Sequence, residues 1–204
     1  MIYCAYSVRQ MLRWSVWVWV SMVALGGCAS KPPKNTNDVC AIFDEKKSWY
    51  KQALRASQRW DIPVAVNMAF MHQESRFVAK AKPPRTRILW LFPGPRKSDA
   101  YGYSQAKKTT WEWYVKSSGR RWADRDDFDD AIDFIAWYNS VTRSKFGLKP
   151  NDAMRLYLAY HEGHGGYQRG SYRKKQWLIN VAKKVEAQRK KYQIQLNRCK
   201  NRGR

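Results

Sequence analysis

The stretch DIPVAVNMAFMHQESRF, residues 61–77, predicts a buried helix that ends beside a single carboxylate, Glu74. Asp61 is a residue type that can cap a helix, and Pro63 suits a first helical turn. Apolar residues recur with the spacing of a buried helix face: Ile62, Val66, Ala69, Phe70 and Phe77. A carboxyl group at the rim of such an element loses part of its hydration, which raises its pKa. Glu74 is therefore a candidate general acid, and a solvated glutamate at a helix end is the alternative.

The N-terminus has the features of an export signal. Arg9 and Arg13 precede an apolar run from Trp14 to Leu25, and the run ends in Leu25-Gly26-Gly27-Cys28. The run is short for a membrane span, and small residues before a cysteine suit cleavage followed by lipid attachment. This arrangement resembles a bacterial lipoprotein signal, with an ordinary N-terminal membrane anchor as the alternative. By analogy with such lipoproteins, Ala29 favours the outer membrane, with the protein facing the periplasm.

These features divide the chain into three parts. We expect residues 1–27 to be removed as a signal peptide and Cys28 to carry the lipid. Residues 28–37 are polar, contain two prolines and have no periodicity, which is typical of a short linker. Residues 38–204 suffice for one domain with a sizeable core. We expect this domain to act as a monomer.

The charge of the chain limits its partners. Its 204 residues include 39 Lys and Arg against 16 Asp and Glu, a formal net charge of +23. Only two of the basic residues and none of the acidic ones lie in residues 1–27, so the exported part keeps a charge of +21. Such a charge requires an acidic partner or surface. An exported lipoprotein does not meet nucleic acid. Peptidoglycan, with its lactyl and peptide carboxylates, and anionic lipid head groups are the expected partners.

The cysteines agree with export. Cys4 is lost with the signal and Cys28 takes lipid, which leaves Cys40 and Cys199 near opposite ends of the exported domain. We expect this pair to form a disulfide bond in the oxidising periplasm. Closing so long a loop would contribute about 4 to 5 kcal/mol of stability in the chain-entropy model. Two free buried thiols are the alternative.

Helical patterns cover most of the rest of the domain. Besides the helix that ends at Glu74, helices are expected at about residues 38–60, 107–118, 126–145, 153–160 and 173–198. The last of these has the clearest apolar stripe, which consists of Trp177, Val181, Val185, Gln188, Tyr192 and Leu196.

Residues 78–100 interrupt the helical pattern. Prolines and a glycine surround a β-prone centre, residues 87–92, so we expect a short hairpin or flap. Because this segment follows Glu74, it is expected to form one wall of a cleft. Its basic residues would face an acidic ligand: Arg85, Arg87, Arg96 and Lys97. A surface loop without a role is the alternative.

Two polar clusters invite other chemistry. The first offers candidates for a second catalytic carboxylate, but acids in the first turns of a helix with basic residues in its last turn are better explained by the helix dipole. Its members are Asp124, Asp126, Asp127, Asp129, Asp130 and Asp133. The second is His161-Glu162-Gly163-His164, which suggests zinc. A helical zinc motif needs histidines four residues apart, so we expect no metal and no other cofactor.

Three motifs occur in an order that points to one family: Glu74-Ser75, Gly102-Tyr103-Ser104-Gln105 and Ala159-Tyr160-His161-Glu162-Gly163. With them, the chain resembles the lytic transglycosylase domain of the goose-lysozyme-like superfamily over about residues 50 to 190. The resemblance implies a mainly α, lysozyme-like helical domain with a small β-hairpin or flap beside the active-site cleft.

The first and third motifs imply roles for the residues around the acid. In that family the glutamate of the first motif is the sole catalytic acid and base, which implies this role for Glu74, and Ser75 would orient the site. The third motif is usually Ala-Tyr-Asn. Tyr160 matches it and would help to hold Glu74, whereas His161 stands where the asparagine is expected.

The second motif departs further from the family. It is usually Gly-Leu-Met-Gln, so Gly102 and Gln105 match, while Tyr103 and Ser104 replace the apolar pair. The substrate-binding residues implied by the resemblance are Ser75, Gly102, Tyr103, Ser104, Gln105, Tyr160 and His161.

The resemblance also implies a reaction. It is cleavage of the β-1,4 bond between MurNAc and GlcNAc in peptidoglycan glycan strands, with formation of a 1,6-anhydroMurNAc end. One carboxylate suffices, because Glu74 would donate a proton to the glycosidic oxygen and then accept one from the C6 hydroxyl. A hydrolytic muramidase, which would need a second carboxylate, is one alternative. A non-catalytic peptidoglycan-binding lipoprotein is the other.

Overall fold

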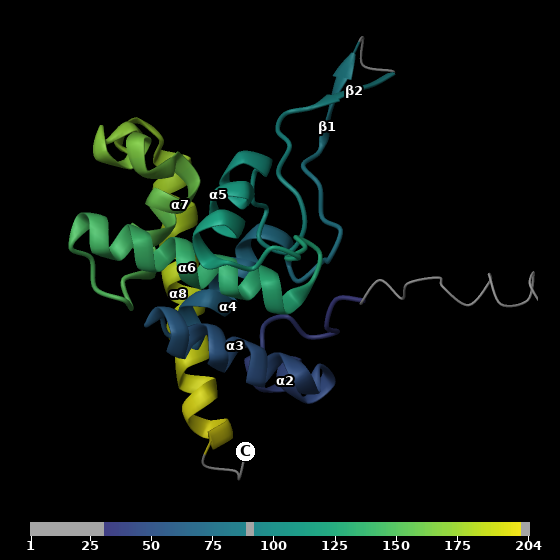
Figure 1. Cartoon of the computed structure of the whole chain (residues 1–204), viewed down its shortest axis with the longest axis vertical. Coiled ribbons are helices and arrows are strands. Elements are labelled where there is room, and N and C mark those ends of the chain that lie inside the picture. The colour runs from purple at the N-terminus through teal and green to yellow at the C-terminus, as the bar shows by residue number, and fades with distance from the viewer. Residues whose placement is uncertain (1–30, 89–91, 201–204) are drawn as a thin grey trace, which may run out of the picture. The chain divides into compact units, whose positions relative to one another are not determined.

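The structure, a computed structural model, describes residues 31–88 and 92–200. The described part is mainly helical with one small antiparallel sheet, which confirms the predicted fold class (Figure 1). The predicted signal peptide, residues 1–27, and the lipid site, Cys28, lie outside the described residues. The elements are α2 (Val39–Glu45), α3 (Lys47–Trp60), α4 (Val64–Ser75), β1 (Arg85–Ile88), β2 (Phe92–Arg96), α5 (Lys108–Ser118), α6 (Phe128–Phe146), α7 (Ala153–Gln168), the 3-10 helix η2 (Ser171–Lys174) and α8 (Gln176–Lys200).

Helix α4 is the central element and packs against α3, α6 and α8. It is buried nearly all round, whereas the sequence predicted one buried face. The prediction that Asp61 caps this helix is wrong. Asp61 ends α3 in the left-handed conformation, with φ of 52°, and Pro63 takes the N-cap position of α4. A residue that precedes proline avoids the helical conformation, so Ile62 keeps the two helices apart.

The first predicted helix is two helices. Asp38 caps α2 by accepting hydrogen bonds from the backbone N–H groups of Cys40 and Ala41, at 2.9 and 3.2 Å. The chain then leaves the helical conformation at Lys46, with φ of −112° and ψ of 75°. The break turns α3 so that Trp49 stacks on Phe128 of α6, with ring centroids 3.9 Å apart. One straight helix could not direct the apolar faces of both segments into the core.

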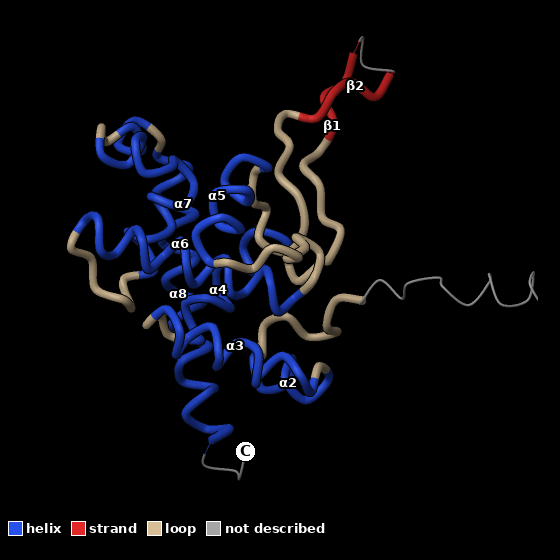
Figure 2. The backbone as a smooth tube through the Cα atoms, viewed as in Figure 1, coloured by secondary structure: helices blue, strands red, loops and turns tan. Residues whose placement is uncertain are grey.

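Strands β1 and β2 form the predicted hairpin, which projects from the helical body (Figure 2). Arg85 pairs with Arg96 at its base, and both side chains are exposed. The Thr86 hydroxyl donates to the Pro95 carbonyl at 2.8 Å. Residues 89–91 of the predicted β-prone centre lie outside the described residues.

Helices α7 and α8 differ from the prediction at their ends. Helix α7 does not stop at Tyr160 but continues to Gln168 through a kink at Gly163, where φ is 71° and ψ is 160°. Helix α8 begins after η2 and packs against α2, α4 and α7. Its buried stripe includes Tyr192, but Trp177 is 56% exposed, so the prediction that Trp177 packs in the core is wrong.

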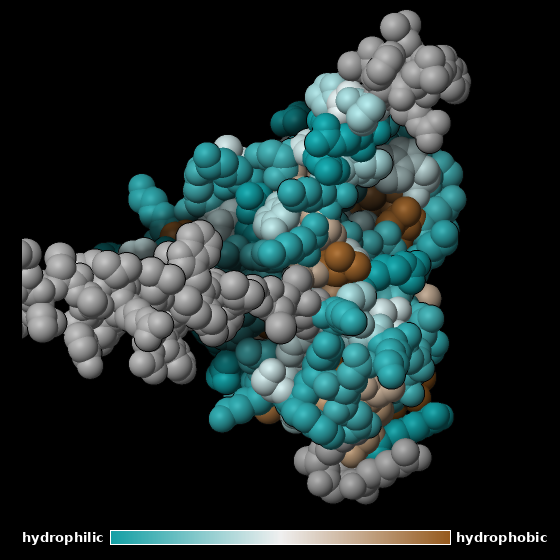
Figure 3. All heavy atoms as spheres, turned by 90° about the vertical axis from the view of Figure 1, so that its right-hand side faces the viewer, coloured by the Kyte–Doolittle hydropathy of each residue, from teal (hydrophilic) through white to brown (hydrophobic). Residues whose placement is uncertain are grey.

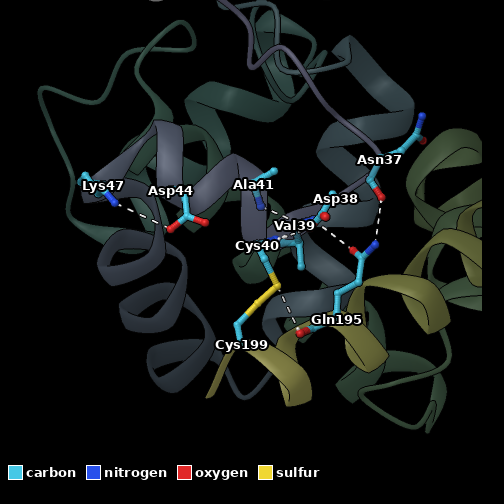
Figure 4. The surroundings of a disulfide bond; sticks show 9 residues. All are labelled: Asn37, Asp38, Val39, Cys40, Ala41, Asp44, Lys47, Gln195 and Cys199. Atoms are coloured by element: carbon cyan, nitrogen blue, oxygen red, sulfur yellow. Dashed lines mark hydrogen bonds and ion pairs between the residues drawn. A yellow bond between two sulfur atoms is a disulfide. The ribbon is translucent and has the colours of Figure 1, made fainter. Parts of the chain in front are cut away.

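The N-terminal segment is fastened to the end of α8. Cys40 and Cys199 form a disulfide bond with their Cα atoms 6.2 Å apart (Figure 4). Next to it, the Gln195 side chain accepts from the Val39 N–H at 3.0 Å and donates to the Asn37 carbonyl at 3.2 Å. The Tyr192 hydroxyl donates to the Thr36 carbonyl. Residues 36 and 37 of the predicted linker therefore lie against the domain.

One face of the described part of the chain is mainly hydrophilic. Among the residues coloured by hydropathy in Figure 3, hydrophilic ones predominate, and only small hydrophobic areas show between them. Among residues 31–88 and 92–200, no helix is long and apolar enough to cross a membrane. This polarity agrees with the excess of Lys and Arg in the sequence.

Candidate active site

A pocket lies where the C-terminal end of α4 meets α6, α7 and the loop before α5. The base of the hairpin segment contributes three residues to it. The described residues that line it are Glu74, Pro83, Ser98, Ala100, Gln105, Ala106, Lys107, Thr110, Phe134, Tyr138, Tyr160, His161, Glu162 and Gly163. The segments named by the three sequence motifs therefore meet at one pocket.

Glu74 has the electrostatics of a general acid. Burial of its carboxyl group disfavours the charged form and raises its pKa to about 7, while a hydrogen bond from the Tyr157 hydroxyl acts in the opposite direction. Arg76 and Phe77, which follow Glu74 and Ser75, both take the left-handed conformation, with φ of 49° and 63°. This sharp turn buries Phe77 in the core and leaves Glu74 at the pocket.

Tyr157 holds Glu74, although the resemblance assigned this task to Tyr160. The Tyr160 hydroxyl instead donates to the Ser104 carbonyl at 2.7 Å. Burial, and then the nearby charge of Glu74, raise the pKa of both tyrosines, so both stay neutral donors. Tyr157 was missed in the sequence, where its only signal is that it lies one helical turn before Tyr160 and on the same face.

The second motif forms a tight loop that needs its glycine. Gly102 has φ of 78°, and a Cβ atom built on it would lie 1.9 Å from the Arg125 carbonyl oxygen. Its N–H donates to the Ala81 carbonyl at 3.0 Å. Gln105 fixes the same loop, because its Nε2 donates to the carbonyls of Ala81 and Gly102 at 3.0 and 2.9 Å. This leaves Oε1 of Gln105 as the polar atom that the side chain can offer to a ligand.

The two unusual residues of this loop and Ser75 do not line the pocket. Tyr103 is buried in the core, where its ring meets those of Trp49 and Phe128 edge-on. Ser104 is fully buried and contributes its backbone carbonyl to Tyr160. The hydroxyl of Ser75 donates back to the Met71 carbonyl at 3.3 Å inside α4. The geometry gives these three residues a supporting place behind the pocket wall.

A second carboxylate, Glu162, lines the pocket, and the sequence argument had passed over it. Its side chain is only 4% exposed. It accepts from Lys175 at 2.8 and 3.0 Å, from the Ser171 hydroxyl and from Nδ1 of His161 at 3.2 Å. Burial acts against the charge, but these donors dominate and lower the pKa of Glu162 to about 2. Glu162 is therefore ionised at neutral pH, and it lines the same pocket as Glu74, whose pKa lies near 7.

The aspartates near the start of α6 lie elsewhere. Asp127 caps α6 by accepting from the Asp130 N–H at 3.1 Å, and Arg120 contacts Asp129 at 2.9 Å and Asp130 at 2.6 Å. Asp133 is buried and accepts from Tyr114 at 2.8 Å. None of the six aspartates between 124 and 133 lines the pocket of Glu74.

Three of the basic residues predicted to face a ligand lie outside the pocket lining: Arg85, Arg96 and Lys97. The side chain of Arg87 is not among those that the structure describes. Pro83, Ser98 and Ala100 contribute to the wall instead, and among the described residues Lys107, at the N-cap position of α5, adds a cation to the lining. Two aromatic residues of α6, Phe134 and Tyr138, complete the pocket, and no motif in the sequence had singled them out. Within the described ranges, no group of three or more His, Cys, Asp and Glu is placed to hold a metal ion.

Comparison with known proteins gives one family. A family model described as Transglycosylase SLT domain matches residues 16–199 of the chain. No curated protein and no solved structure matches it.

Proposed function

The chain belongs to the family of transglycosylase SLT domains, and from this premise we propose that it is a peptidoglycan lytic transglycosylase in which Glu74 is the acid and base. It cleaves the β-1,4 bond between MurNAc and GlcNAc and leaves a 1,6-anhydroMurNAc end. The observation that carries the proposal is the pKa of Glu74, which burial raises to about 7 in a pocket open to a ligand. A carboxyl group with this pKa can donate a proton near neutral pH and take one back.

The reaction needs one proton carrier. Glu74 gives its proton to the glycosidic oxygen as the bond from that oxygen to C1 of MurNAc breaks, and positive charge develops at C1. The ionised Glu74 then removes the proton of the C6 hydroxyl of the same MurNAc, and this oxygen bonds to C1. The GlcNAc hydroxyl leaves, no water is consumed, and Glu74 ends protonated as it began. Tyr157, which donates to Glu74, stabilises the ionised form between the two steps.

Hydrolysis would require a second carboxylate that can activate water. Glu162 is the other carboxylate in the lining, but Lys175, Ser171 and His161 occupy its oxygens. With a pKa of about 2, it is a weak base. These contacts favour transglycosylation over hydrolysis. A non-catalytic binding protein would have no need to keep a buried carboxyl group at the destabilising cost of burial.

The sequence supports a place for this enzyme in the cell envelope. We propose that Cys28 carries a lipid which anchors the protein to the outer membrane, facing the periplasm, where it acts as a monomer on peptidoglycan strands. The segment that follows the anchor meets the domain at the C-terminal end of α8, where Thr36 and Asn37 are bound. That end of the domain would then face the membrane, and the net charge of the chain would attract it to acidic polymers.

Product analysis tests the proposed reaction. Sacculi digested with the wild-type protein should release muropeptides with 1,6-anhydroMurNAc ends, which are lighter than hydrolysed products by one water and resist reduction by borohydride. The Glu74→Gln variant should release none, while it still binds sacculi. Reducible products would show hydrolysis, and binding without any products from the wild type would show a non-catalytic protein.

A further inference from the structure

Trp177 lies beside the pocket with most of its side chain in solvent. The sequence predicted it in the core, yet it is 56% exposed at the start of α8. Its ring meets the ring of His161 edge-on, with centroids 5.1 Å apart and an interplanar angle of 80°. His161 lines the pocket that contains Glu74. The exposed ring of Trp177 therefore adjoins the pocket through its contact with His161.

Hydrogen bonds and an ion pair hold His161 and the start of α8, which carries Trp177. Nδ1 of His161 lies 3.2 Å from Oε1 of Glu162, and since a carboxylate can only accept, Nδ1 carries the proton. Glu162 is in turn bound by Lys175, which lies two residues before Trp177. The ion pair of Glu162 and Lys175 thus holds His161 directly and holds the segment that leads to Trp177. In the neutral ring, a proton at Nδ1 leaves Nε2 of His161 as a hydrogen-bond acceptor.

We propose that His161 and Trp177 form a platform that binds a further sugar ring of the glycan strand, beyond the two rings joined by the bond that Glu74 cleaves. This inference rests on the proposed function for the identity of the strand. The C–H face of a pyranose ring packs on the exposed face of Trp177. A hydroxyl or amide N–H of the same sugar donates to Nε2 of His161. Such a mixture of an apolar face and a directed polar atom is what a sugar ring offers.

A membrane surface is a less suitable partner for the exposed Trp177 side chain than a glycan strand. The proposed anchor enters the domain near Cys199, at the other end of the same helix. Trp177 and Cys199 are 22 positions apart, which corresponds to about 33 Å of α-helix. A strand in the pocket passes directly beside Trp177, whereas the residues nearest the proposed anchor are bound at the opposite end of α8.

Binding by the inactive protein tests the platform. Trp177→Ala is introduced into the Glu74→Gln protein, and its affinity for peptide-free glycan strands is measured by calorimetry, with the MurNAc–GlcNAc disaccharide and with longer strands as probes. We expect the affinity for longer strands to fall about tenfold or more, which is the size of a lost aromatic contact. The affinity for the disaccharide should change less than about twofold. Trp177→Phe should recover most of the loss.

Trp122→Ala is the matched control, because Trp122 is 96% exposed and does not line the pocket. It should leave both affinities unchanged. Equal effects of the two alanine variants, or an equal loss for the disaccharide and the longer strands, would overturn the platform. A loss seen only with peptide-bearing strands would assign Trp177 to a peptide stem and also overturn it. These outcomes are independent of the product analysis, which tests the reaction.

Discussion

The hydroxyl of Tyr157, in α7, donates a hydrogen bond to the carboxyl group of Glu74, which lies 83 residues earlier in the chain. Two opposing effects meet at this contact. Burial favours the neutral carboxyl, and the tyrosine favours the carboxylate. Because the first effect is larger, the pKa settles near 7 and not at an extreme that would serve only the acid or only the base.

Removal of this hydroxyl should shift the titration of Glu74. In Tyr157→Phe the carboxylate loses its donor, so the pKa of Glu74 rises and the alkaline limb of kcat/KM moves up by about 0.5 to 1 pH unit. Tyr160→Phe is the control, since its hydroxyl donates to the Ser104 carbonyl and not to Glu74. Tyr160→Phe should lower activity, because it removes the hydrogen bond to the loop at Ser104. The alkaline limb of kcat/KM should stay at its wild-type pH. The idea fails if both variants move the limb equally.

The wild-type enzyme should show an alkaline limb set by Glu74. The free enzyme must carry the proton, so kcat/KM should fall about tenfold per pH unit above a midpoint near pH 7. Glu162 has a pKa of about 2 and should add no limb above about pH 4. The measurement is the pH dependence of anhydro-product release. An acidic limb above that pH that disappears in Glu162→Gln would instead assign Glu162 the role of a base.

Features of this site that depend on residues close together in the sequence could be predicted, and contacts between residues far apart in the sequence could not. The helix that carries Glu74 could be predicted, because its apolar spacing and the turn after it are local features. The partner of the carboxyl could not, because Tyr157 of α7 reaches it only in the folded chain, where its ring contacts Phe70 of α4. The same holds for Glu162, because its pairing with Lys175 joins α7 to the residue between η2 and α8, and this contact exists only in the folded chain.

The errors in the helices have local causes. The apolar spacing of residues 38–60 is continuous, so nothing in it reveals the break at Lys46 that lets α2 and α3 pack on different neighbours. Trp177 fits the stripe of α8 by periodicity, but it stands at the first turn, where it contacts His161 of α7 and remains 56% exposed. Periodicity predicts the direction of a side chain and cannot tell whether another element lies there.

Replacement of Glu74, the proposed catalytic acid, should stabilise the fold at alkaline pH. The pKa of Glu74 is raised from 4.5 to about 7 on folding. Between these values the unfolded chain is ionised while the folded chain keeps its proton, so wild-type stability falls as pH rises through this window. Glu74→Gln lacks this loss and should be more stable by about 1 to 3 kcal/mol at pH 8. Urea unfolding should find no difference near pH 4, and a difference that persists there would refute the linkage.

Gly102 should be far more sensitive to substitution than another glycine of the same conformation. Gly102 and Gly119 have φ of 78° and 76°, but a Cβ atom on Gly119 would meet nothing within 4 Å. Gly119→Ala should therefore cost only the backbone strain, about 1 to 2 kcal/mol. On Gly102 the Cβ atom would collide with the Arg125 carbonyl, so Gly102→Ala should cost more than about 3 kcal/mol and displace Gln105. Thermal unfolding compares the two variants, and similar losses would contradict the collision.

The Cys40–Cys199 disulfide should contribute stability without shaping the pocket. It joins residues 159 apart, and closing such a loop is worth about 5 kcal/mol in the chain-entropy model. The double variant Cys40→Ser/Cys199→Ser should lose about 2 to 5 kcal/mol of unfolding free energy in urea. Neither cysteine lines the pocket, so kcat/KM should stay within about twofold where the variant is folded. Reductant should destabilise the wild type to the same extent and leave the double variant unchanged. A double variant that unfolds at the wild-type urea concentration would mean that Gln195 and Tyr192, which bind residues 36–39, suffice to hold the termini together.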